Sequence, residues 1–149
     1  MKTKSQEFHF PQELYAEYLL QYFAEKNGYR LYHLSPDLTV PDWQFFQLIT
    51  PRWEVEVSTH ETEMLLWTNC FAEIEYSLKI YLKIMTLCLQ FNRENRYFKL
   101  DYCVSPKPSI FFSLSVELFN PTEDWLTQTL VALWLSIDEV RNKLNRLKE

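Results

Sequence analysis

The chain has 149 residues, a length that fits one domain over residues 1–149, and its 47% hydrophobic and 23% charged residues are typical of a globular protein. Its acidic net charge of −5 argues against a dedicated nucleic-acid-binding protein, which needs a basic face to displace counterions from phosphates. The single glycine, Gly28, excludes phosphate-binding loops, dinucleotide-binding fingerprints and the nucleophile elbow, because each of them needs several glycines.

The first predicted element is a helix over residues 11–27. Pro11 suits the first helical turn, and Gly28 suits the left-handed residue that follows a last turn. Apolar side chains recur at helical spacing, namely Leu14, Tyr18, Leu19, Tyr22 and Phe23. The stretch 29–42 contains two prolines and is predicted as a connection, within which 29–34 is a candidate short strand.

Three strands are predicted next, at 43–49, 52–58 and 63–69. The second strand has the period of two that marks a half-buried strand, with one face formed by Trp53, Val55 and Val57 and the other by Arg52, Glu54 and Glu56. Because the links between the strands are short, we expect an antiparallel meander.

A second helix is predicted over residues 71–91. Its polar positions form one narrow stripe, so the helix is apolar over most of its circumference and has to be covered on more than one side. One sheet covers only one side, and we therefore expect another polypeptide to cover the rest. The candidate dimer contacts are Leu78, Leu82, Met85 and Leu89. The charged residues of this segment argue against membrane insertion.

Two further strands, at 96–104 and 110–118, are predicted to form a hairpin with a proline-containing loop. The last helix is predicted to open at residues 120–123, with Asn120 as its cap, a proline in the first turn and a carboxylate three residues after the cap. Its apolar seam indicates a helix laid along a packed surface and comprises Leu126, Leu130, Leu133, Ile137, Val140, Leu144 and Leu147.

The sequence gives no motif for catalysis, and we expect no metal ion, no cofactor and no enzymatic activity. The three histidines are dispersed, and His60, although followed by two glutamates, lacks a second histidine at ligand spacing. Glu54 and Glu56 share a strand face, but a carboxylate pair supports acid–base chemistry only where burial separates the two pKa values. Solvent exposure is the expectation, and their burial beside a deep pocket would favour an enzyme.

Cys70, Cys88 and Cys103 form no closely spaced pair, so we expect three free thiols, buried or half-buried, in a reducing compartment. Cys88 falls within the apolar helix, too deep for an accessible thiolate. The N-terminal ten residues have no apolar signal core. Together these observations predict a cytoplasmic protein.

Aromatic residues make up 17% of the chain and are expected mainly in the core, since each buries a large area. Tryptophan and tyrosine are also enriched where proteins meet, which gives the alternative of a partner surface. The candidate partner-binding residues are Trp43, Phe45, Trp53 and Trp67.

The predicted α+β order, α-βββ-α-ββ-α with an antiparallel five-stranded sheet packed by helices, resembles the fold shared by class I type III secretion chaperones and the YbjN-like bacterial proteins. The resemblance covers about residues 11–148 and rests on the meander 43–69, the apolar helix 71–91 and the block 92–147. It is a likeness of architecture. It implies a homodimer, often formed by the middle helices, whose exposed apolar patches hold an extended partner segment.

Two functional hypotheses follow. The leading one is a non-enzymatic cytoplasmic protein-binding module with chaperone or adaptor character, which holds an apolar or extended client segment against the sheet and the first helix, with backbone pairing at an edge strand. The alternative is a small-molecule-binding domain with a pocket between the sheet and the C-terminal helix, lined by Tyr102 and Cys103.

Overall fold

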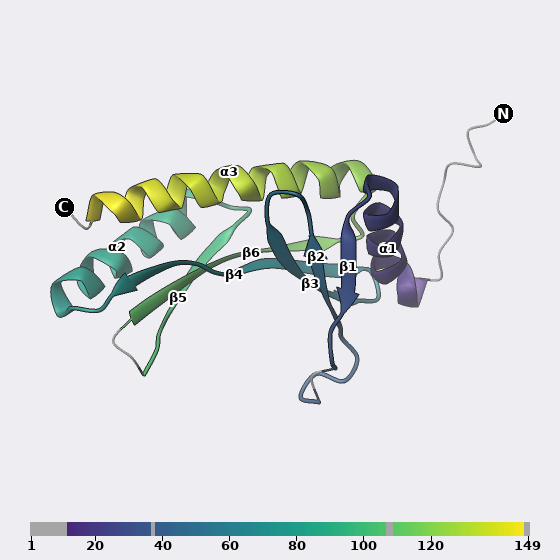
Figure 1. Cartoon of the computed structure of the whole chain (residues 1–149), viewed down its shortest axis with the longest axis horizontal. Helices are drawn as coiled ribbons and strands as arrows, with labels where there is room; N and C mark the ends of the chain where they lie inside the picture. Colours follow the sequence, from purple (N-terminus) through teal and green to yellow (C-terminus); the bar gives the residue numbers. More distant parts are fainter. Residues whose placement is uncertain (1–11, 37, 107–108, 148–149) are drawn as a thin grey trace.

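The computed structural model describes residues 12–36, 38–106 and 109–147, without the side chains of residues 69–71 (Figure 1). A short 3-10 turn, Gln12–Leu14, leads into helix α1 (Tyr15–Asn27). The helix ends as predicted, because Gly28 adopts a left-handed φ of 69° and its N–H donates to the carbonyl of Glu25. Pro11, the predicted first residue, lies outside the described ranges.

Within the described ranges, one antiparallel sheet of six strands forms the centre of the fold, in the order β1-β2-β3-β4-β6-β5. The strands are β1 (Arg30–His33), β2 (Gln44–Ile49), β3 (Glu54–His60), β4 (Glu63–Glu75), β5 (Lys99–Val104) and β6 (Ser109–Phe119). The predicted α+β class is therefore confirmed, with six strands rather than five. The sixth is the candidate short strand, which pairs with β2 from Arg30 opposite Ile49 to His33 opposite Phe46.

The helices pack on one face of the sheet. Helix α3 (Glu123–Leu147) runs along most of the length of the sheet. Helix α2 (Leu78–Glu94) lies beside the C-terminal half of α3, and α1 lies at the other end of the sheet (Figure 1). The predicted seam of α3 is buried against the sheet from Leu126 to Leu144, and Leu147 is partly buried. Among the helices in the described ranges, none combines the length and the apolar character that crossing a lipid bilayer requires.

The predicted start of the middle helix at residue 71 is wrong, because β4 continues to Glu75. Ala72 lies opposite Phe112 and Ile74 opposite Ile110, after a register shift that follows Thr68. Here apolar residues alternate with glutamates, which is a strand period rather than a helical one. The helix begins only at Leu78, where the Ser77 side chain accepts a hydrogen bond from the N–H of Ile80 (3.2 Å).

The predicted cap of α3 is also wrong. Thr122, not Asn120, caps the helix, because its hydroxyl accepts a hydrogen bond from the N–H of Trp125 (3.1 Å). Asn120 instead has a left-handed φ of 52°, which asparagine tolerates better than most residues, and its N–H donates to the carbonyl of Thr62 (2.8 Å). Asn120 thus serves the turn between β6 and α3.

Candidate protein-binding surface

An exposed apolar stripe runs along α2. Leu78, Leu82 and Leu89 are 65%, 55% and 65% exposed, and Met85 lies among them half-buried. The opposite side of the same helix is buried in the core through Ile84, Cys88 and Phe91. The chain therefore covers one side of α2 and leaves in contact with solvent the apolar row whose residues are the candidate dimer contacts.

The stripe borders strand β5. The ring of Tyr81 meets the ring of Tyr102 edge to face, with centroids 5.8 Å apart, and their hydroxyls are 3.5 Å apart. That hydrogen bond, together with desolvation, raises the pKa of Tyr102 to about 12. Asn92, which lies about three turns after Tyr81 on α2, also contacts β5. Met85 lies in the same helical row, which explains why it is less exposed than its leucine neighbours.

Strand β5 forms one edge of the sheet, and α2 closes part of that edge. The Asn92 side chain binds both backbone polar groups of Leu100, which therefore point away from β6. Because backbone direction alternates along an antiparallel strand, the groups of Tyr102 and Val104 point the same way. The Val104 side chain is exposed beside them. Nothing in the sequence pattern signalled this role of Asn92.

Three of the four predicted partner-binding residues share the sheet face that carries no helix. Phe45 lies opposite Ser58, and Trp67 lies opposite Glu56, on the same face of the sheet. Trp43 precedes β2 and stacks on His60 of this face, with ring centroids 5.1 Å apart. All three aromatic side chains are half-buried.

Trp53 lies elsewhere. It precedes β3 on the helix-covered side and stacks on Trp134 of α3, with ring centroids 6.0 Å apart and planes inclined by 16°. Both tryptophans line a pocket of about 300 Å³ between α1, the β2–β3 turn and α3. A pocket between the sheet and the C-terminal helix thus exists, but Tyr102 and Cys103 are not among the residues that line it.

The thiols differ in exposure. Cys88 is buried, and burial, followed by the nearby charge of Asp101, raises its pKa to about 12. Cys103 is exposed, which corrects the prediction of a half-buried thiol: its side chain lies on the sheet face without helices. The side chain of Cys70 lies outside the described part of the structure.

Glu54 and Glu56 lie on the face opposite Val55 and Val57, as their alternation predicted. Glu54 is exposed and accepts a hydrogen bond from the Gln47 side-chain amide (2.9 Å), while Glu56 is half-buried. Neither residue lines the pocket beside Trp53. The pair is therefore a polar part of the open sheet face, without the burial that acid–base catalysis needs.

The fold places the chain in the class of α+β proteins in which helices cover one face of a coiled antiparallel sheet. The crystal structure of YbjN, a proposed transcription regulator from E. coli, shares this fold with a TM-score of 0.60. The match covers 87% of this chain and 90% of YbjN at 12% sequence identity, which confirms the architectural resemblance and shows the fold alone. No family model matches the sequence, and no curated protein matches it.

Proposed function

We propose that this protein is a non-enzymatic, cytoplasmic protein-binding module with chaperone or adaptor character, and that it acts as a homodimer joined through α2. The observation that carries the proposal is the exposed stripe of Leu78, Leu82, Met85 and Leu89. Contiguous apolar surface of this kind is costly to leave in water and marks interaction sites.

A second copy of the chain is the occupant that best fits the stripe. Its residues are spaced by four, three and four positions, an order that reads the same in both directions. In an antiparallel pair of α2 helices, Leu78 therefore faces the partner's Leu89, and Leu82 faces the partner's Met85. This self-complementarity is what a twofold interface requires. The steps of four and three are also those of helices that pack along a shared seam.

The client would lie on the open face of the sheet. Phe45 and Trp67 offer half-exposed aromatic surface there, and Glu56 lies directly opposite Trp67 in the strand register. Leu65 of the same face lies opposite Glu117. Apolar anchors that alternate with carboxylates suit an extended client segment in which apolar and basic residues alternate.

The dimer is tested by replacing Leu82 and Met85 together with glutamate and measuring the mass in solution by light scattering. We expect the wild type to have the mass of two chains and the variant the mass of one, because positions 82 and 85 face each other across the twofold axis and four carboxylates would be buried together there. Thr86→Glu with Gln90→Glu is the matched control, since it adds the same charge to α2 outside the stripe. A wild-type protein that is already monomeric would contradict the proposed dimer.

The client surface is tested by placing a photo-crosslinking phenylalanine analogue at position 45 and irradiating the protein in an extract of its host. A protein captured by this variant, and no longer captured when Glu56→Lys is added, supports the proposed basic and apolar client. Capture that is unaffected by the charge reversal contradicts it. The same analogue at Tyr18 of α1 serves as the control for chance contacts.

A further inference from the structure

The pocket beside Trp53 lies at the opposite end of the sheet from α2, and the function proposed above does not use it. Its volume of about 300 Å³ is at the small end of the range for ligand pockets, roughly 300–1,000 Å³. Three parts of the chain meet there, namely the end of α1, the turn between β2 and β3 and the first half of α3.

Four of the residues that line the pocket are aromatic. Trp53 and Trp134 stack with their planes inclined by only 16°, and Phe23 meets Tyr29 edge to face with centroids 6.0 Å apart. Phe23 and the neighbouring Leu130 are buried and belong to the core, so the floor of the pocket is fixed by packing. Flat aromatic walls of this kind bind flat apolar ligands, because rings prefer stacked and edge-to-face contacts.

Three neutral polar side chains that line the pocket, those of Asn27, Thr50 and Thr127, are bonded to the backbone of the protein. The Asn27 amide donates to the carbonyl of Phe23 (2.8 Å), the Thr50 hydroxyl to that of Trp53 (3.0 Å), and the Thr127 hydroxyl to that of Glu123 (3.1 Å). The hydroxyl hydrogens of Thr50 and Thr127 and one of the two N–H groups of the Asn27 amide are therefore engaged within the protein. The part of a ligand that enters the pocket has to be mainly apolar, since buried polar atoms without partners are destabilising.

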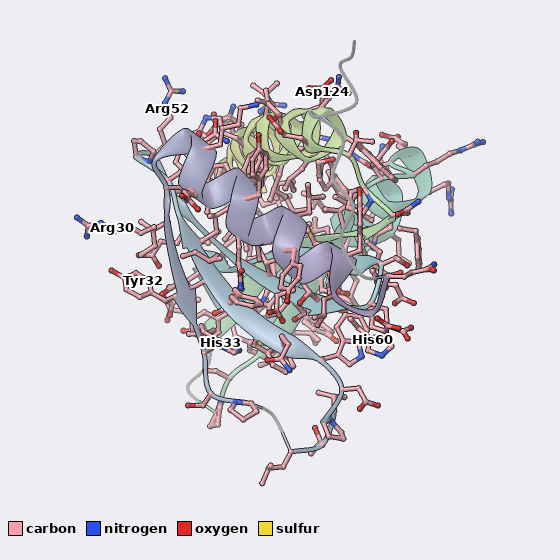
Figure 2. All side chains as sticks on the ribbon, turned by 90° about the vertical axis from the view of Figure 1, so that its right-hand side faces the viewer. Arg30, Tyr32, His33, Arg52, His60 and Asp124 are labelled. Atoms are coloured by element: carbon pink, nitrogen blue, oxygen red, sulfur yellow. The ribbon has the colours of Figure 1, made fainter. Side chains whose placement is uncertain are left out.

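Arg52 is the one charged residue among those that line the pocket. It is exposed, and in the described part of the chain its guanidinium forms no ion pair. The turn that presents it is held by Thr50, whose hydroxyl accepts from the N–H groups of Arg52 (3.3 Å) and Trp53 (3.2 Å). Figure 2 shows Arg52 reaching outward into solvent at one side of the molecule.

We infer that this pocket binds a flat aromatic ligand that carries one negatively charged group. The ring lies against Trp53 and Trp134, and the anionic group remains at the mouth, where the guanidinium of Arg52 provides a charge-assisted hydrogen bond. The inference stands independently of the α2 dimer, because no residue of the stripe on α2 takes part in the pocket.

Two probes of equal shape separate the apolar and the ionic contributions: 2-naphthoate, which is an anion at neutral pH, and the neutral 2-naphthamide. Binding is followed by quenching of tryptophan fluorescence and by calorimetry. We expect the wild type to bind both and to prefer the anion by about fivefold or more, because an exposed guanidinium forms a modest ion pair. Arg52→Gln should abolish that preference and leave binding of the amide unchanged.

Arg30→Gln is the matched control. Arg30 is also exposed and also projects outward in Figure 2, but it does not line the pocket. The Arg30→Gln variant should retain the preference for the anion. Val131→Trp fills the mouth of the pocket from the exposed side of α3 without altering the core. It should weaken the binding of both probes about tenfold.

Three results would overturn the inference. The first is that neither probe binds at millimolar concentration to protein whose circular dichroism and melting curve are native. The second is a preference for the anion that survives Arg52→Gln or is lost equally in Arg30→Gln. The third is unchanged binding in Val131→Trp, which would place the probes elsewhere, for example on the stripe of α2.

Discussion

Asn92 and Leu100 are joined by two hydrogen bonds that tie helix α2 to the edge of the sheet. The side-chain Nδ2 of Asn92 donates to the carbonyl of Leu100 (3.0 Å), and the N–H of Leu100 donates to Oδ1 of Asn92 (2.7 Å). A side-chain amide thus takes the place that the backbone of a further strand would occupy. At this point of β5 the backbone groups of the edge are satisfied within the chain.

Asn92→Ala should lower the free energy of unfolding by about 1–3 kcal/mol, because it leaves the N–H and the carbonyl of Leu100 without their partner. The midpoint of urea unfolding measures this loss. Gln90→Ala is the control on the same helix, since Gln90 bonds only to Glu94 at the surface (3.0 Å) and should change stability by less than about 0.5 kcal/mol. Equal effects of the two changes would contradict the role of Asn92.

The thiols of Cys88 and Cys103 should react at very different rates with an alkylating reagent at pH 8. Cys103 is exposed, whereas Cys88 is buried and its pKa is raised to about 12, so that it holds almost no thiolate at this pH. Mass spectrometry of the peptides that contain these two residues, after timed labelling, should find Cys103 modified before Cys88 and Cys88 modified only when urea is added. Labelling of Cys88 in the native protein as fast as that of Cys103 would show that α2 opens readily.

The buried thiol of Cys88 should make the folded state less stable at alkaline pH. The unfolded chain releases the Cys88 proton near its ordinary pKa of 9.0, whereas the folded chain keeps it until about pH 12. The folded state therefore binds more protons in this window, and its stability falls as the pH rises above 9. Urea unfolding at a series of pH values measures the slope. Cys88→Ala removes the thiol and should have a shallower slope than the wild type.

The cap of α3 provides a fourth prediction. Thr122→Ala should lower stability by about 1 kcal/mol, because the N–H of Trp125 loses its acceptor. Asn120→Gly should be close to neutral, since glycine adopts the φ of 52° at this position without strain. Thermal unfolding of both variants distinguishes the two assignments. A larger loss in Asn120→Gly than in Thr122→Ala would restore Asn120 as the cap.

The elements with a long, regular apolar period could be predicted from the sequence. The α3 seam and the alternation of Val55 and Val57 correspond to buried positions, and the exposed stripe on α2 follows from an excess of apolar residues over covering surface. The boundary between β4 and α2 could not be placed, because Ala72 and Ile74 lie shortly before the apolar residues of α2 and only the alternation with Glu73 and Glu75 distinguishes the strand.

The candidate sites were predicted unevenly, for a topological reason. Trp43, Phe45 and Trp67 fall on one sheet face because of the strand register, of which the short links made only the antiparallel order predictable. The pocket brings residues of α1 together with Trp53 and with Trp134, which lies more than a hundred positions from α1 in the chain, and no local pattern encodes that meeting. Tyr102 and Cys103 were assigned to a pocket because β5 could not be placed at the edge of the sheet.

Strand β4 determines how the sheet unfolds. Its thirteen residues pair with β3 along the first half and with β6 on both sides of the register shift. The two ends of the sheet therefore have one strand in common, and the loss of β4 from the sheet would separate them. Amide protons in β2 and in β6 should exchange with solvent in a single concerted opening, and a chain cut within β4 should yield no fragment that folds by itself.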